Sequence, residues 1–199
     1  MRILVDLDGT IAHFGAKFHR LRLELFPHLD GIPHPDNQTN FNMWEGRSEE
    51  EQNAIRTIMN YNGFYRDLEP MEGAVEAIHE MIAEGHEVRF LSAPWTTNPT
   101  CAQDKYDWIA EHFGEEFREN LFLVKHKDWV SGDILFDDKY PIPHAEDADW
   151  VQVFITQPYN VKASGYRISG MSQWREAIAS VYEDAYRNYG KVLRDEVRV

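Results

Sequence analysis

Short apolar runs alternate with amphipathic stretches along most of this 199-residue chain. Each run is bounded by charged residues or by glycine, and it is too short for a helix, so we interpret the runs as buried strands. The first run ends directly in acidic residues. The predicted strands are Ile3–Val5, Val88–Leu91, Leu121–Val124, Ile134–Phe136 and Val151–Ile155.

The amphipathic stretches carry apolar residues three or four positions apart, which predicts helices that bury one face. In one of them, Ser48 is followed three residues later by Glu51, the pattern of a capping box. The residues from Leu29 to Asn42 are rich in Pro, Asp, Asn and His and are predicted to form a loop. Helices are predicted over 14–26, over the residues after Ser48, over 74–82, over 106–113 and from Ser172 onward.

Strands that alternate with helices indicate an α/β fold with a mostly parallel sheet, in a Rossmann-like core of three layers. Residues 14–68 lie between the first and second predicted strands and are long for a crossover. We interpret them as a small helical cap inserted after the first strand and placed over the strand ends. The predicted core is therefore formed by residues 1–13 and 69–199.

Composition and charge narrow the classes of function. The formal net charge of -14 disfavours binding to long nucleic acid, although a small phosphorylated substrate needs only a local positive pocket or a bound cation. No apolar run approaches the roughly 20 residues of a membrane span. The single cysteine, Cys101, excludes an intrachain disulfide, and the first residues lack the pattern of a signal peptide, so we expect a cytoplasmic protein.

Polar residues follow several predicted strands where each strand ends. The run Asp6-Leu7-Asp8-Gly9-Thr10 follows the first strand, Ser92 follows the second, and the pair Asp137-Asp138 follows Phe136. Active sites of parallel sheets lie at the carboxyl ends of the strands, so we expect these side chains to converge. Nearby carboxylates repel one another unless a cation or a proton intervenes, so we expect a functional acidic site that holds one or the other.

The segment Asp6–Thr10 resembles the first motif of the haloacid dehalogenase superfamily. The resemblance implies that Asp6 is a nucleophile that forms an aspartyl-phosphate, and that Asp8 protonates the leaving group and then activates water. Ser92 is similar to the second motif, which binds a phosphoryl oxygen. Lys125 and Lys127 are both candidates for the third motif, a lysine that stabilises the phosphate charge.

The acidic segment Asp133–Asp138 resembles the fourth motif, and a closer resemblance extends over most of the chain. Segments similar to those of the 5'(3')-deoxyribonucleotidases are Phe64–Ala74, Lys105–Ile109 and Lys127–Lys139. The spacing within this resemblance favours Lys127 over Lys125. The resemblance also implies a Mg²⁺ site formed by Asp6, Asp138 and the backbone carbonyl of Asp8, with Asp137 as a neighbour that acts through water.

In that family the nucleobase packs against aromatic side chains, partly from the cap. Phe14 and Phe41 match such positions by spacing, and Trp44 and Tyr61 are nearby candidates, although ordinary helical packing is the alternative interpretation of each. The chain departs from the family at Ser92-Ala93, where a Thr-Ser pair is usual, which leaves the preference for base and sugar open.

The resemblance implies hydrolysis of a nucleoside monophosphate, with a deoxyribonucleotide favoured, and Mg²⁺ as cofactor. Two alternatives stay open. The same core is compatible with a phosphatase of sugar phosphates or other small metabolites, because the cap sets the substrate. It is also compatible with a binding module that has lost catalysis. The oligomeric state, including a homodimer, is left open too.

Overall fold

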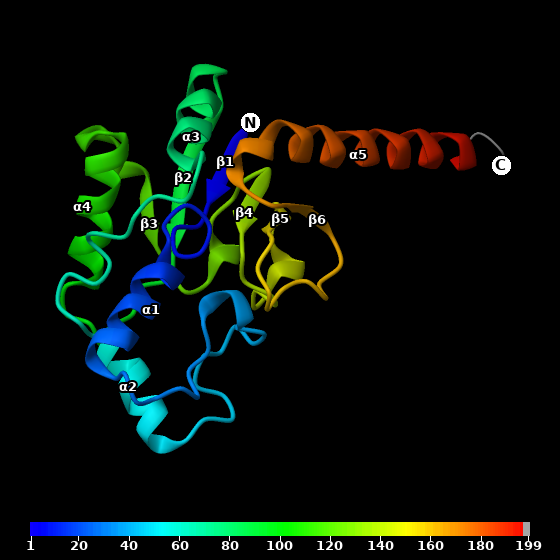
Figure 1. Ribbon diagram of the computed structural model, residues 1–199. Coiled ribbons are helices and arrows are strands. Elements are labelled where there is room, and N and C mark those ends of the chain that lie inside the picture. Colours follow the sequence, from blue (N-terminus) through cyan, green and yellow to red (C-terminus); the bar gives the residue numbers. More distant parts are fainter. Residues whose placement is uncertain (197–199) are drawn as a thin grey trace.

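Six parallel strands form the sheet at the centre of the molecule (Figure 1). The computed structural model describes residues 1–196. The strand order is β3-β2-β1-β4-β5-β6, and each neighbouring pair is parallel, which confirms the predicted α/β fold. The strands are β1 (Arg2–Val5), β2 (Glu87–Ser92), β3 (Leu121–Leu123), β4 (Ile134–Asp137), β5 (Val151–Ile155) and β6 (Tyr166–Ile168).

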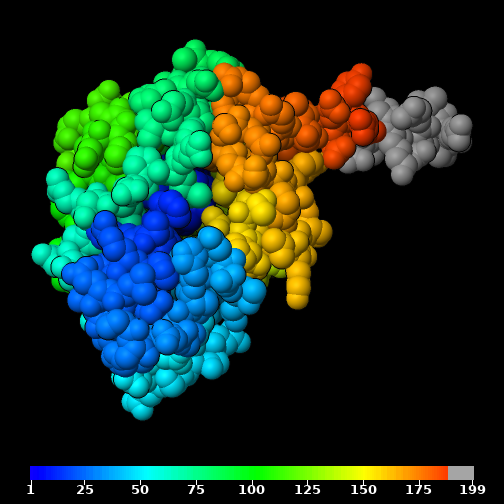
Figure 2. Space-filling model, viewed as in Figure 1, coloured from blue at the N-terminus to red at the C-terminus, as the bar shows by residue number. Residues whose placement is uncertain are grey.

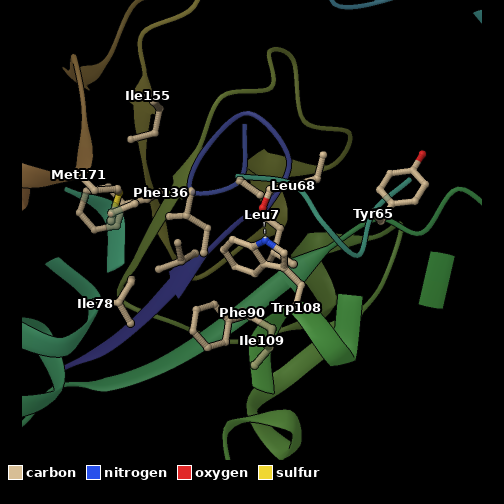
Figure 3. Packing of buried hydrophobic residues seen from close by; sticks show 14 of the residues in the cluster. Leu7, Tyr65, Leu68, Ile78, Phe90, Trp108, Ile109, Phe136, Ile155 and Met171 are labelled. Atoms are coloured by element: carbon tan, nitrogen blue, oxygen red, sulfur yellow. Dashed lines mark hydrogen bonds between the residues drawn. The ribbon is translucent and has the colours of Figure 1, made fainter. Parts of the chain in front are cut away.

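Two hydrophobic clusters cover the two faces of this sheet. Ile3 and Val5 of β1 point to one face and Leu4 to the other, because side chains alternate along a strand. The larger cluster packs helices against the first face, where Phe90, Trp108 and Ile109 lie together (Figure 3). The helices are α1 (Phe14–Leu25), α2 (Glu49–Met59), α3 (Ala74–Ala83), α4 (Cys101–Phe113) and α5 (Trp174–Glu196).

The opposite face of the sheet has a thinner cover. Leu4, Leu91 and Leu135 pack there against Ile142 and Trp150, which come from the loops around β4 and β5. Two short 3-10 helices, η3 (Lys127–Trp129) and η4 (Ala145–Asp147), complete this side. The third layer of the core therefore consists of loops and short turns in the part of the chain that the structure describes, and α3, α4 and α5 cover the other face.

Residues 14–68 leave the sheet and return to it at one place. The amide of His13 donates to the carbonyl of Glu69 at 2.8 Å, and the amide of Met71 donates to the carbonyl of Ile11 at 2.8 Å. Between these crossings, α1 and α2 pack against each other. In the space-filling view these blue-to-cyan residues form a lobe beside the core (Figure 2).

The local signals of the sequence correspond closely to the observed elements. The capping box at the start of α2 is present, with Ser48 and Glu51 bonded reciprocally. The loop 29–42 contains one 3-10 turn, Pro35–Asn37, and α4 begins at Cys101, earlier than predicted. Strand β6 was not predicted, and residues 197–199 of the predicted core lie outside the described part. Within residues 1–196, every helix is too short or too polar to cross a bilayer.

Candidate active site

Three buried carboxylates meet at the carboxyl ends of the two central strands. Asp6 directly follows β1, Asp137 is the last residue of β4, and Asp138 comes next. Since β1 and β4 are neighbours in parallel, their ends lie side by side, and ligand atoms of the three residues lie within 4.8 Å of one another. Their exposed fractions are 6%, 0% and 2%. The predicted convergence of the first and fourth motifs is therefore observed.

Lys127 lies inside this acidic cluster, at the start of η3. Its Nζ donates to Asp6 Oδ1 at 2.6 Å and also to a carboxylate oxygen of Asp137, and the side chain is buried. The two carboxylates raise the pKa of Lys127 in spite of its burial, so the ammonium stays charged. Lys125, the alternative that the sequence offered, is exposed.

The cluster carries more negative charge than Lys127 offsets. Burial raises the pKa of Asp137 to about 6, and burial together with the neighbouring carboxylates raises that of Asp138 well above its usual value. Buried charges of one sign are costly unless paired. Carboxylate oxygens are the ligands that Mg²⁺ and other hard cations prefer, so this donor set fits a divalent cation.

Asp8 is connected to the second strand through a residue that we did not predict as part of the site. Lys105 of α4 donates from Nζ to Asp8 Oδ2 at 2.5 Å and to Ser92 Oγ at 3.0 Å. The other carboxylate oxygen of Asp8, Oδ1, is buried and has no hydrogen-bond partner among the described residues. Burial raises the pKa of Asp8, and the nearby Lys105 ammonium opposes that shift.

Lys105 is almost fully buried, at 1% exposed, and its ammonium lies 4.8 Å from the ring centroid of Tyr65. A signal for it exists in the sequence. Lys105 precedes Trp108 and Ile109 by three and four positions, which places it on the buried face of the helix. A lysine on an apolar face needs a charged partner, and here the partner is Asp8.

Two polar residues donate hydrogen bonds to the carboxylate of Asp138. Thr10 Oγ1 donates to Asp138 Oδ1 at 3.3 Å, and the Tyr159 hydroxyl donates to Oδ2. Burial and the neighbouring carboxylate raise the pKa of Tyr159, so its hydroxyl keeps the proton that it donates. Tyr159 lies in the loop after β5, and no local pattern in the sequence marks it.

The aromatic residues that were predicted to form a base pocket contact different neighbours. Phe14 is half-buried in a cluster where its ring lies 5.9 Å from that of Phe18 and 5.2 Å from that of Phe64. Phe41 is 42% exposed and meets Tyr159 edge to face, with ring centroids 5.6 Å apart. Phe41 is therefore the candidate that contacts a neighbour of the acidic cluster directly.

The other two aromatic candidates lie near the loop that follows β2. Trp44 packs against Trp95 with ring centroids 5.5 Å apart, and Trp95 lies three residues after Ser92. Tyr61 is 46% exposed, and its backbone carbonyl accepts a hydrogen bond from Asn98 in the same loop. The loop after Ser92 thus joins residues 14–68 to the sheet.

Comparisons with known proteins agree with this geometry. Residues 1–183 match the family described as 5' nucleotidase, deoxy (pyrimidine), cytosolic type C protein. The human mitochondrial 5'(3')-deoxyribonucleotidase is 33% identical over 168 residues, covering 80% of this chain and 72% of that protein. The human 5'(3')-deoxyribonucleotidase of cytosolic type is 30% identical over 190 residues, covering 90% of this chain and 94% of that protein.

A crystal structure of a haloacid dehalogenase family hydrolase from Deinococcus radiodurans, with bound phosphate and sodium, has the same fold. It superposes with a TM-score of 0.54 at 15% identity and covers 90% of this chain and 95% of that one. The family match over residues 1–183 and the fold point to the same conclusion. The chain has the fold of a haloacid dehalogenase family hydrolase and belongs to the 5' nucleotidase, deoxy (pyrimidine), cytosolic type C family.

Proposed function

We propose that this chain is a Mg²⁺-dependent 5'(3')-deoxyribonucleotidase that releases phosphate from nucleoside monophosphates through an aspartyl-phosphate on Asp6. The observation that carries the proposal is the cluster at the sheet edge, where Lys127 contacts Asp6 at 2.6 Å beside Asp137 and Asp138. The names of the human relatives support the class of substrate.

In the first step, a carboxylate oxygen of Asp6 attacks phosphorus, and the bond from phosphorus to the ester oxygen breaks. The departing oxygen takes a proton from the Asp8 carboxyl group, so that the nucleoside leaves as an alcohol. Ser92 and Lys127 stabilise the charge on the phosphoryl oxygens. Lys105, which bridges Asp8 and Ser92, holds both of these side chains in place.

In the second step, water attacks the phosphorus of the aspartyl-phosphate while the Asp8 carboxylate accepts its proton. The bond between phosphorus and the Asp6 oxygen breaks, and phosphate leaves. Asp6 is thereby returned as a carboxylate and Asp8 as an acid, so both are ready for another turnover. The contact between Lys127 and Asp6 keeps the nucleophile oriented throughout.

Asp6, Asp138 and the backbone carbonyl of Asp8 would hold the Mg²⁺, which when bound offsets the negative charge of the phosphoryl group. Asp137 is buried and paired with Lys127. It would therefore contact the Mg²⁺ through a water molecule and not directly. Ligand atoms of Asp6, Asp137 and Asp138 already lie within 4.8 Å of one another, which supports this assignment.

In this proposal residues 14–68 are a helical cap on a core formed by 1–13 and 69–199, and the cap closes over the substrate. Phe14, Phe41, Trp44 and Tyr61 supply aromatic faces for the base. The paired crossings at Ile11–His13 and Glu69–Met71 support a cap that moves as a unit. A cytoplasmic location is part of the proposal, supported by the human relative of cytosolic type.

The test is phosphate release from deoxyribonucleoside and ribonucleoside monophosphates and from common sugar phosphates, each with Mg²⁺ and with EDTA. We expect release that requires Mg²⁺ and is fastest with deoxynucleotides. Release from sugar phosphates alone would keep the chemistry at Asp6 and overturn the base pocket. A folded sample that releases no phosphate from any of these substrates would contradict the proposal and favour a binding module.

A further inference from the structure

The carboxylate of Asp138 is held from several sides by neighbouring residues. Thr10 donates to Oδ1 at 3.3 Å, the Tyr159 hydroxyl donates to Oδ2, and Asn160 Nδ2 donates to the backbone carbonyl of Asp138 at 2.7 Å. A carboxylate that binds a metal ion is usually oriented by such hydrogen bonds, and their loss weakens metal binding. Among these donors, Tyr159 is the one whose side chain contacts Phe41, a residue of 14–68.

The loop that carries Tyr159 is itself firmly anchored to the core. Asn160 is 0% exposed, and its Oδ1 accepts hydrogen bonds from the Gln157 amide at 3.1 Å and from Arg167 Nη1 at 3.0 Å. Gln157 Nε2 in turn donates to the carbonyl of Gly9 at 3.0 Å. These hydrogen bonds attach the loop to the strand ends that carry Asp6 and Asp138. They fix the backbone position from which the Tyr159 side chain extends.

The Tyr159 hydroxyl and the Asp138 carboxylate pack closely against the backbone of Gly9. A Cβ atom added at Gly9 would lie 2.7 Å from Asp138 Oδ2 and 3.3 Å from the Tyr159 hydroxyl. Gly9 also has a φ of +84°, which favours glycine. The hydroxyl, the carboxylate oxygen and the Gly9 backbone thus form one close contact, in which a displaced ring would release Asp138.

The outer edge of the Tyr159 ring is contacted from residues 14–68. Phe41 meets it edge to face at an interplanar angle of 79°. Lys139, the residue after Asp138, places its Nζ 5.3 Å from the centroid of the Phe41 ring. Aromatic pairs of this geometry attract each other beyond the effect of simple burial. Tyr159 is therefore in contact with a residue of the proposed cap on one side and with a proposed metal ligand on the other.

We propose that Tyr159 is a positioning residue that orients the Asp138 carboxylate for the divalent cation, and that Phe41 holds the Tyr159 ring in the orientation this requires. The contact between Phe41 and Tyr159 therefore couples the position of residues 14–68 to the affinity of the site for the cation. This inference rests on the proposed function, because it assigns Asp138 to the cation.

The test is direct binding of Mg²⁺, measured by isothermal titration calorimetry without substrate, on the full chain. Tyr159→Phe removes the hydroxyl and keeps the ring, and we expect its Kd for Mg²⁺ to rise about 10-fold or more. The matched control is Tyr166→Phe, whose hydroxyl donates to Asp184 at 2.9 Å on the far edge of the sheet, and its Kd should equal that of the wild type.

Phe41→Ala provides a second and independent variant. We expect it to raise the Kd for Mg²⁺ about 3-fold, because it removes the aromatic contact that holds the Tyr159 ring. In the background of Tyr159→Phe, Phe41→Ala should not change the Kd for Mg²⁺ further, because Phe41 acts on Asp138 only through the Tyr159 hydroxyl.

The outcomes separate this inference from the proposed function. A wild-type chain that binds no Mg²⁺ would overturn both. Wild-type binding with an unchanged Kd in Tyr159→Phe would overturn the positioning role alone. An effect of Phe41→Ala that persists in full in the double variant would overturn the link between the two aromatic residues.

Discussion

Replacing Lys127 with methionine tests the electrostatic description of the acidic cluster. The Lys127 side chain is 6% exposed and donates to two carboxylates that are also buried, Asp6 and Asp137. Methionine keeps most of the volume of the side chain and removes the charge. The change leaves the carboxylates of Asp6, Asp137 and Asp138 without a counter-charge inside the protein.

Removing one partner of a buried ion pair costs about 3–5 kcal/mol of unfolding free energy. For a chain of 199 residues this corresponds to a fall in Tm of roughly 6–20 °C. Added Mg²⁺ should restore more stability to Lys127→Met than to the wild type, because a bound cation supplies the missing charge. The value of kcat should fall by about 10²–10³, since a donor to the phosphoryl group is lost.

The assay is urea unfolding followed by circular dichroism, in EDTA and then in Mg²⁺, beside phosphate release. The matched control is Lys125→Met, which removes an exposed lysine two residues away and should change the unfolding free energy by less than about 0.5 kcal/mol. If Lys127→Met unfolds in EDTA with the free energy of the wild type, the cluster does not depend on this ammonium and the reasoning fails.

Four further changes address the chemistry and the backbone. Asp6→Asn should abolish phosphate release while the circular dichroism spectrum stays native; near-normal turnover would refute the nucleophile. Asp8→Asn should lower kcat by about 10²–10⁴ and still bind orthophosphate, and an unchanged rate would argue against acid–base work. Lys105→Met should lower kcat/KM for phosphate release by about 10²–10³, because it removes the charged group that holds Asp8 and Ser92 in place. Gly9→Ala should lower the Tm more than Gly63→Ala, because both have positive φ but a Cβ at Gly9 meets a carboxylate oxygen at 2.7 Å whereas one at Gly63 meets open space; equal losses would contradict the close packing.

Much of the fold follows from local patterns. The strands at the centre of the sheet are short apolar runs, and each predicted run lies within a strand or within one residue of its end. β6 (Tyr166–Ile168) is different, because Arg167 interrupts its apolar character. That strand exists because it pairs with the edge of β5, and such pairing is a tertiary interaction that a window of sequence does not contain.

The site divides in the same way. Asp6, Asp138 and Lys127 stand at or just beyond strand ends in recognisable motifs, so the sequence could place them, and the parallel sheet brings them together. The sequence around each aromatic residue did not determine its position in the fold. Phe14 packs among other rings, whereas Phe41 reaches Tyr159, and both outcomes depend on how residues 14–68 fold over the sheet.

The sequence alone determined the class of fold and the acidic motifs, because strands, helices and motifs are patterns of residues near one another in the chain, and its resemblance to a known family favoured Lys127 over Lys125. Only the tertiary structure placed Lys105 against Asp8, 97 residues away, and Tyr159 against Asp138, 21 residues away. The physical reason is that a buried charge or hydroxyl must find a partner, and the partner is chosen by the packing of helices and loops around the sheet.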